Sequence, residues 1–331
     1  MNYRFFGKGD LKVSEIGLGC ASLGGGLYYK DDQESIKTLL KAFDSGINFY
    51  DTSDVHSQGN AQRLVGQAFR SKRDRVVIAS KTGVVLSNLG SLASQMRPLV
   101  RPVSRFLRPM KRFLHQMRAS QRYFDFSAQY LAKVIDRSLK LLQTDYLDLF
   151  QLYKPPTSLL EKGDFCETLD SLKTQGKIRY YGVTCATADD ALISLKHSGI
   201  SSVQINLNLL DQEAIAKLLP LSVEKQIAVI ANHPRAMGLL TNAHSDIMSD
   251  TSLYDQREFE ERRARAKKFQ FLIKKDRTLA QASIQFVLQL KGVSVAIPRA
   301  VNREQLEENL SALTASPLRN EELMKIYSMN S

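Results

Sequence analysis

The sequence predicts an α/β fold in which residues 1–331 form a single (β/α)8 barrel domain. Two patterns indicate this fold: eight short, almost wholly apolar runs recur along the chain, and stretches with helical apolar periodicity separate them. Unbroken apolar strands are buried on both faces, as in parallel sheets, and repeated strand–helix alternation is typical of this barrel. A doubly wound sheet is the alternative, but the first run lacks the G-x-G-x-x-G turn that usually opens it.

The predicted strands, in chain order, are residues 15–19, 47–51, 75–81, 146–153, 178–184, 202–206, 226–232 and 293–298. The amphipathic stretches between them include 35–46, 128–143, 190–199 and 279–290, and glycine, which is frequent just after helices, ends two of them. Long loops follow the third strand (82–127) and the seventh (233–277). Loops of this length usually carry function or structure of their own, and no linker interrupts the chain.

The formal net charge of +12 is concentrated in one segment. Residues 84–124, a basic insertion within the barrel, hold eight Lys and Arg residues and no acidic one. A near-neutral body with one basic segment argues against nucleic-acid binding across the fold. The insertion itself has three interpretations: an apolar face packed on the barrel with solvated arginines, a docking face for an anionic or carrier-bound substrate, or peripheral contact of residues 90–120 with an anionic membrane.

Composition argues against a membrane-spanning, secreted, disulfide-bonded or metal-binding protein. The sequence contains no run of 18 apolar residues, so it predicts no transmembrane helix. The N-terminal residues lack the apolar core of a secretory signal. The three cysteines form no disulfide framework, so we expect a cytoplasmic protein. The histidines show no metal-ligand spacing, and we expect no metal.

Active sites of (β/α)8 barrels lie at the carboxyl ends of the strands. Asp51 and Lys81 stand at the ends of apolar strands, where a charge is costly unless it is paired. Such a pair is either a structural ion pair or part of a functional site. Spacing alone leaves both interpretations open.

Seven segments in order resemble the motifs of the aldo-keto reductases, and together they cover nearly the whole chain. They are GINFYDTSDVHSQGNAQRLVGQAF, VVIASKTG, SLKLLQTDYLDLFQLYKP, QGKIRYYGVT, SVQINLNLL, VIANHPRAMGLLT and VAIPRAVNREQLEENLSAL. The resemblance implies a (β/α)8 barrel that binds NADP(H) without a Rossmann motif. It also implies hydride transfer between the nicotinamide and a carbonyl carbon of a small-molecule substrate, with Asp51 and Lys81 in two of the four catalytic positions.

The other two catalytic positions depart from the family's pattern. His56 stands where the family has its proton-donating Tyr, and Tyr153 stands where it has a His. Three outcomes follow from these residue types. Tyr153 donates the proton while His56 orients the substrate; or a neutral His56 acts as a base, in alcohol oxidation or in redox-neutral chemistry such as dehydration, isomerisation or cyclisation; or redox chemistry is lost and a non-catalytic nucleotide-binding protein remains.

The resemblance also assigns the cofactor site. The family's Ser-Asn pair after the fifth strand is replaced by Thr184-Cys185, whereas Gln204 and Asn208 match the pattern. In the cofactor-binding tail the matching or neighbouring positions are Arg299, Arg303, Glu308 and Asn309. Arginine suits a phosphate group because its donors form a fork, so we expect NADP(H) rather than NAD(H).

Overall fold

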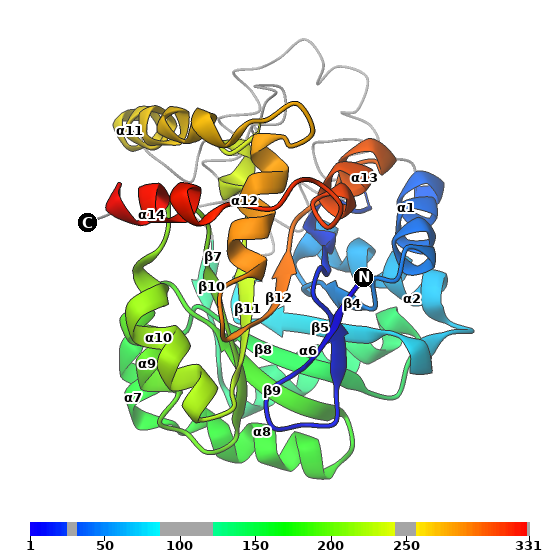
Figure 1. The fold of residues 1–331 in the computed structure, drawn as a ribbon. Coiled ribbons are helices and arrows are strands. Elements are labelled where there is room, and N and C mark those ends of the chain that lie inside the picture. Colours follow the sequence, from blue (N-terminus) through cyan, green and yellow to red (C-terminus); the bar gives the residue numbers. More distant parts are fainter. Residues whose placement is uncertain (25–31, 87–121, 242–255, 330–331) are drawn as a thin grey trace.

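The predicted barrel is confirmed by a parallel sheet that closes on itself (Figure 1). The computed structural model describes residues 1–24, 32–86, 122–241 and 256–329. In sheet order the strands are β3 (Leu18–Gly19), β4 (Phe49–Asp51), β5 (Val77–Thr82), β8 (Leu147–Tyr153), β9 (Ile178–Thr184), β10 (Ile200–Asn206), β11 (Ala228–Asn232) and β12 (Val293–Ile297). Each overlaps one of the predicted strands.

Closure depends on the short first strand. The Gly17 amide donates to the Ala296 carbonyl at 2.8 Å, and the Ala296 amide donates to the Glu15 carbonyl at 2.9 Å. A second parallel bridge joins Gly19 to Arg299 at the carboxyl end. These bonds join β3 to β12, so neither strand is left as an open edge.

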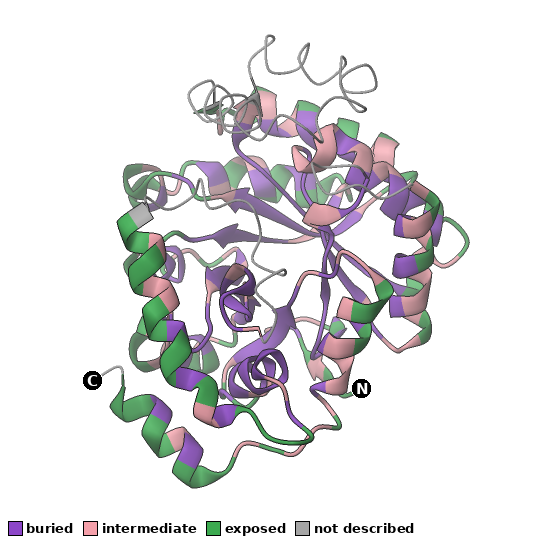
Figure 2. Ribbon diagram, turned by 90° about the horizontal axis from the view of Figure 1, so that it is seen from above, coloured by how far each residue is buried: buried purple, intermediate pink, exposed green. Residues whose placement is uncertain are grey.

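Helices surround the strands, and Figure 2 shows the strands buried within this ring. The apolar stripe of each amphipathic helix turns inward and its polar residues face solvent. The helices are α1 (Asp32–Asp44), α2 (Asn60–Phe69), α6 (Ala128–Leu142), α7 (Thr157–Lys162), α8 (Phe165–Thr174), α9 (Ala188–Ser194), α10 (Glu213–Glu224), α11 (Gln256–Lys267), α12 (Leu279–Leu288), α13 (Arg303–Ser311) and α14 (Asn320–Ser328). Every helix in these described stretches is too short or too polar to cross a bilayer.

An N-terminal hairpin covers one end of the barrel. Its strands are β1 (Tyr3–Phe5) and β2 (Lys12–Ser14), and its Phe6 ring stacks on Phe49 with 5.9 Å between centroids. The Arg4 guanidinium joins the hairpin to the end of α12 and the start of β12. It donates to the carbonyls of Leu288 (2.6 Å) and Val293 (2.8 Å). Because this end is filled by apolar side chains, the polar groups of the barrel interior gather at the other end.

The two long loops carry structure of their own. Strands β6 (Val84–Leu86) and β7 (Arg122–Phe124) pair as an antiparallel hairpin at the two ends of the basic insertion. Seven of its eight basic residues fall in 87–121, outside the described residues, so the three interpretations of the insertion stay predictions. The loop after β11 contains α11, whose dense mixed charge is typical of a solvated helix face.

Close packing between α2 and α6 generates a stability prediction. A Cβ added at Gly66 would lie 2.5 Å from the Leu142 carbonyl oxygen and 2.6 Å from its carbonyl carbon. Gly66→Ala gains about 1 kcal/mol of helix propensity, but overpacking against backbone costs roughly 1–3 kcal/mol. Because the clash is with backbone and not with a flexible side chain, we expect the upper end of that cost and a net loss of about 2 kcal/mol, measured by urea unfolding.

Gln67, exposed on the same helix, supplies the matched control. Gln67→Ala should change the free energy of unfolding by no more than about 0.5 kcal/mol. A Gly66→Ala variant as stable as the wild type would contradict the close approach of the two helices.

Candidate active site

The predicted Asp51–Lys81 pair forms at the open end of the barrel. β4 lies beside β5, and the Lys81 ammonium donates to Asp51 Oδ2 at 2.5 Å and to the Thr52 carbonyl at 3.2 Å. Both side chains are 6% exposed. Asp51 Oδ1 is buried and has no hydrogen-bond partner among the residues that the structure describes. Burying two charges is expensive even when they are paired, so an ion pair with an unused acceptor fits a working site better than a purely structural role.

His56 lies in the loop after β4, at the start of the short 3-10 helix η2 (His56–Gly59). Its Nδ1 is buried and accepts or donates no hydrogen bond within the described part of the chain. Burial, together with the charges of Lys81 and Arg299, holds the pKa of His56 well below its ordinary value. The imidazole is therefore neutral at pH 7, and it lies close enough to Lys81 to respond to the ammonium charge.

Tyr153 ends β8, the strand next to β5. The register pairs Lys81 with Gln151, and side chains two residues apart on a strand share a face. Gln151 is buried inside the barrel, so Tyr153 lies one level above it at the mouth, where it is half-buried. Its hydroxyl makes no hydrogen bond to the described residues. The strand geometry thus brings Tyr153 to the same opening as the ion pair.

A polar layer forms the floor beneath Tyr153. Gln204 Oε1 accepts hydrogen bonds from Gln151 Nε2 (2.8 Å) and from Thr184 Oγ1 (3.4 Å). Gln151 Oε1 is buried without a partner. The structure therefore brings the predicted residues Thr184 and Gln204 together and adds Gln151, which sequence reasoning missed. The sequence does hold a signal for Gln151, because it is the one amide side chain in the apolar run LDLFQLY.

The predicted cofactor tail forms a second cluster after β12. Buried Asn309 donates from Nδ2 to the Arg299 carbonyl at 3.1 Å, while its Oδ1 has no partner. Arg235, also missed by sequence reasoning, donates to the same carbonyl at 2.8 Å and lies 3.7 Å from Glu308. Arg303 is exposed at the start of α13. These contacts fix the backbone of the tail and leave one buried acceptor unused.

Asn208 joins two loops at the mouth. Its Nδ2 donates to Asp211 Oδ2 (2.9 Å) and to the His233 carbonyl (3.1 Å), and its Oδ1 accepts from the amides of Leu210 and Asp211. These four bonds use the full capacity of the amide group. The structure therefore shows Asn208 positioning the loop after β11, and its contact with a cofactor stays a prediction.

Basic side chains act on the histidines at the mouth, and several residues of its loops have positive φ. Burial and the charges of Arg299, Lys154 and Lys81 hold the pKa of His233, like that of His56, well below its ordinary value. Positive φ, uncommon for residues other than glycine and frequent at functional sites, recurs in three loops at the mouth. The residues are Ser57, Gln58, Lys154, His233, Ala236 and Met237.

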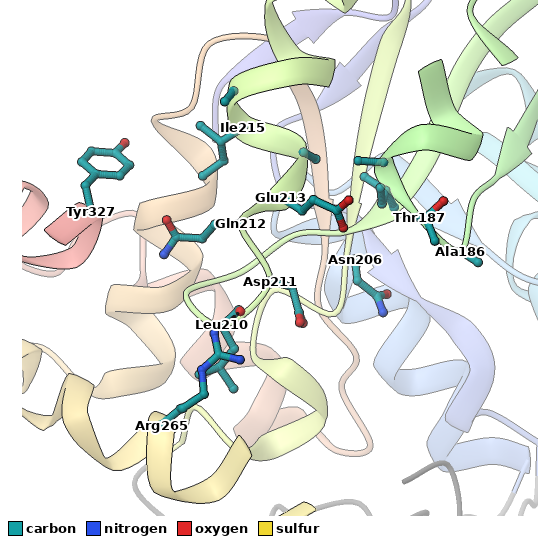
Figure 3. Close-up of a pocket in the computed structure, with 14 residues that line it drawn as sticks. Ala186, Thr187, Asn206, Leu210, Asp211, Gln212, Glu213, Ile215, Arg265 and Tyr327 are labelled. Atoms are coloured by element: carbon teal, nitrogen blue, oxygen red, sulfur yellow. Dashed lines mark hydrogen bonds between the residues drawn. The ribbon is translucent and has the colours of Figure 1, made fainter. Parts of the chain in front are cut away.

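A separate cavity of about 660 Å³ lies beside the mouth, among α9, α10, α11 and α14 (Figure 3). Thr187, Asn206, Glu213, Arg265 and Tyr327 are among the residues that line it. None of the four predicted catalytic residues lines this cavity. It is therefore distinct from the site built around the ion pair.

Comparison with known proteins identifies the family. The sequence model described as "Aldo/keto reductase family" matches residues 15–331. The uncharacterized oxidoreductase YqkF of Bacillus subtilis is 31% identical over 333 residues, covering 99% of this chain and 96% of that protein. The NADH-specific methylglyoxal reductase of Escherichia coli is 28% identical, with 71% and 68% covered.

Solved structures agree with these matches. The holo form of the aldo-keto reductase AKR11C1 from Bacillus halodurans superposes with a TM-score of 0.77 at 26% identity, covering 99% of this chain and 96% of that one. The glycerol dehydrogenase AKR11B4 from Gluconobacter oxydans has a TM-score of 0.75 at 21% identity, covering 99% and 94%. The second likeness shows a shared fold.

The two neutral histidines generate a prediction about stability and pH. In the unfolded chain His56 and His233 bind protons near pH 6.5, whereas in the folded protein their lowered pKa values keep them neutral there. Stability is therefore greatest above pH 6.5 and falls as the pH drops toward 5, by up to about 1.4 kcal/mol per pH unit for each histidine. Urea unfolding between pH 7.5 and 5 measures this slope.

His56→Gln and His233→Gln should each reduce the slope, and the double variant should reduce it further. A slope that survives in the double variant would show that other groups produce it.

Proposed function

This chain belongs to the aldo/keto reductase family, a family of nicotinamide-dependent oxidoreductases, and we propose that it interconverts a carbonyl and an alcohol with NADP(H). The proposed catalytic residues are Asp51, His56, Lys81 and Tyr153. The observation that carries the proposal is the buried Lys81–Asp51 ion pair, one oxygen of which is unused, at a barrel mouth shared with His56 and Tyr153.

The residues around the mouth fit a nicotinamide nucleotide. Among the described residues, Gln151 Oε1 in the polar floor and Asn309 Oδ1 in the tail are buried acceptors without partners. The carboxamide N–H groups of a nicotinamide and the amino group of an adenine are donors that would satisfy them. Thr184 and Gln204 would hold the nicotinamide end. Arg299, Arg303, Glu308 and Asn309 would hold the adenosine end, with Asn208 positioning the loop between the two ends.

We assign the proton-donating role to Tyr153. The cofactor supplies or accepts the hydride at the carbonyl carbon. A tyrosine hydroxyl brings a donor proton, and Tyr153 donates it to the carbonyl oxygen in the reductive direction. The Lys81 ammonium, anchored by Asp51, stabilises the phenolate that remains, because opposite charges attract strongly at a site shielded from water.

His56 then orients the substrate. A neutral imidazole presents one N–H donor and one acceptor nitrogen, and the N–H of His56 would polarise the carbonyl oxygen beside Tyr153. The same neutral imidazole favours a second candidate function, in which His56 removes a proton next to a carbonyl without net redox change. The two candidates differ in whether the nicotinamide absorbance changes during turnover.

The preference for NADP(H) over NAD(H) rests on Arg299 and Arg303. Arg303 is exposed, and its one described ion pair, with Glu307 at 4.0 Å, is long. An exposed arginine with a weak partner is free to bind a phosphate in a bidentate manner. The Escherichia coli relative is described as NADH-specific, so the preference has to come from residues of this chain.

Substitution of the two exchanged residues tests the proton donor. Tyr153→Phe should lower kcat for aldehyde reduction by about a hundred- to ten-thousand-fold, the usual contribution of general acid catalysis. His56→Asn replaces the imidazole N–H with an amide N–H donor and should lower kcat less than Tyr153→Phe does. Lys81→Met should abolish turnover in both candidate functions. The measurement is the rate of NADPH oxidation for the reductase, and consumption of the carbonyl compound at constant nicotinamide absorbance for the redox-neutral candidate.

The pH profile separates the donors independently. With Tyr153 as donor, the rate stays level between pH 8 and 6, since His56 does not titrate there. A His56 imidazolium donor would instead make the rate rise about tenfold for each unit that the pH falls, and that result would overturn the assignment to Tyr153.

Arg303→Ala tests the cofactor preference. Loss of a charged hydrogen bond to phosphate, about 1.5–3 kcal/mol, should raise the KM for NADPH by roughly 10- to 100-fold while the KM for NADH changes little. Arg70→Ala, at an exposed arginine that follows α2, is the matched control. Equal changes in both KM values would show that Arg303 does not recognise the extra phosphate.

A further inference from the structure

We propose that Lys154 binds an anionic group of the substrate, a carboxylate or a phosphate, and so makes the protein selective for charged carbonyl compounds. The inference rests on the proposed function and extends it to a substrate class. Lys154 directly follows Tyr153 at the carboxyl end of β8 and is exposed at the mouth. It contributes nothing to the catalytic steps derived above.

The backbone of Lys154 is held in an unfavourable conformation. Its φ is +48°, which glycine adopts freely and a residue with a Cβ adopts at a cost. Its amide donates to the Thr184 carbonyl at 2.8 Å, which fixes it against β9. Glycine would adopt this backbone conformation at a lower conformational free energy. We therefore infer that the lysine is present at this position for its side chain.

Within the described stretches of the chain, no carboxylate pairs with the Lys154 ammonium. Among the described residues Lys154 forms no ion pair, and its Nζ lies 5.7 Å from the centre of the Tyr153 ring. Its charge also reaches His233 across the mouth, where it acts together with Arg299 and Lys81 to lower the pKa. An exposed ammonium that forms no ion pair with the described residues attracts anions.

The barrel places this cation away from the cofactor tail. Counting around the closed sheet, β8 lies four strands from β12 in either direction, so Lys154 and Arg299 project from opposite sides of the barrel. A dinucleotide whose phosphates lie at Arg299 leaves Lys154 to the substrate. Because Lys154 adjoins the proposed proton donor, the anionic group and the reacting carbonyl belong to the same small molecule, a few bonds apart.

Matched pairs of aldehydes test this selectivity. Succinic semialdehyde is compared with butanal for the carboxylate, and glyceraldehyde 3-phosphate with glyceraldehyde for the phosphate. We expect the charged member of at least one pair to have a kcat/KM at least tenfold higher than its partner. The pair that shows the difference identifies the anion.

Three variants assign that difference to Lys154. In Lys154→Met the charged-to-uncharged ratio of kcat/KM should fall toward one, mainly through KM of the charged aldehyde, and Lys154→Arg should restore part of it. Lys162→Met removes an exposed lysine from α7 and should leave the ratio unchanged. Ratios near one in the wild-type enzyme, or equal ratios in wild type and Lys154→Met, would overturn the proposal while the reductase function stands.

A binding measurement separates this inference from the proposed function. Succinate and inorganic phosphate, which cannot be reduced, are titrated into wild type and Lys154→Met, and the histidine resonances are followed by NMR. We expect the His233 resonance to respond to one of the anions in the wild type and much less in the variant. Such binding without any aldehyde reduction would refute the reductase but support anion recognition, whereas equal or absent binding in both proteins refutes the role of Lys154.

Discussion

The buried ion pair between Lys81 and Asp51 is the interaction on which the site depends. Two charges removed from water would destabilise the barrel if either lost its partner, so the adjacent strands that hold them must keep their register. The pair also determines its surroundings. The ammonium helps to keep His56 neutral, and the unused Asp51 oxygen leaves hydrogen-bonding capacity for groups that enter the mouth.

The exchange of His56 and Tyr153 is chemically coherent around this pair. His56, in the loop after β4, and Tyr153, at the end of β8, reach the same opening, so under the proposed mechanism the donor and the orienting group exchange places without moving the lysine. The polar floor of Gln151, Thr184 and Gln204 lies below either arrangement. Under the proposed mechanism the proton would arrive from a different direction, because Tyr153 belongs to β8 whereas His56 lies in the loop after β4.

Much of the fold could be predicted from the sequence because parallel strands buried on both faces are almost continuously apolar. The Asp51–Lys81 pair could be predicted for a related reason: a charge at the end of such a strand has few alternatives to pairing. Arg235 could not be found in this way, since its partner, the Arg299 carbonyl, is far away in the chain and carries no side-chain signal. The N-terminal hairpin was missed because its strands have only three residues each, too few for a periodicity to emerge.

The bonds that close the barrel cannot form until late in the synthesis of the chain. The N-terminal hairpin and first strand leave the ribosome first, but their partners in β12 and at the end of α12 are made almost last. At about 5–20 residues per second the interval is roughly 15 to 60 seconds. During that interval Phe6 and the apolar interior of the unfinished sheet lack their final cover. Aggregation of the nascent chain therefore competes with folding until the last strand of the barrel has been made.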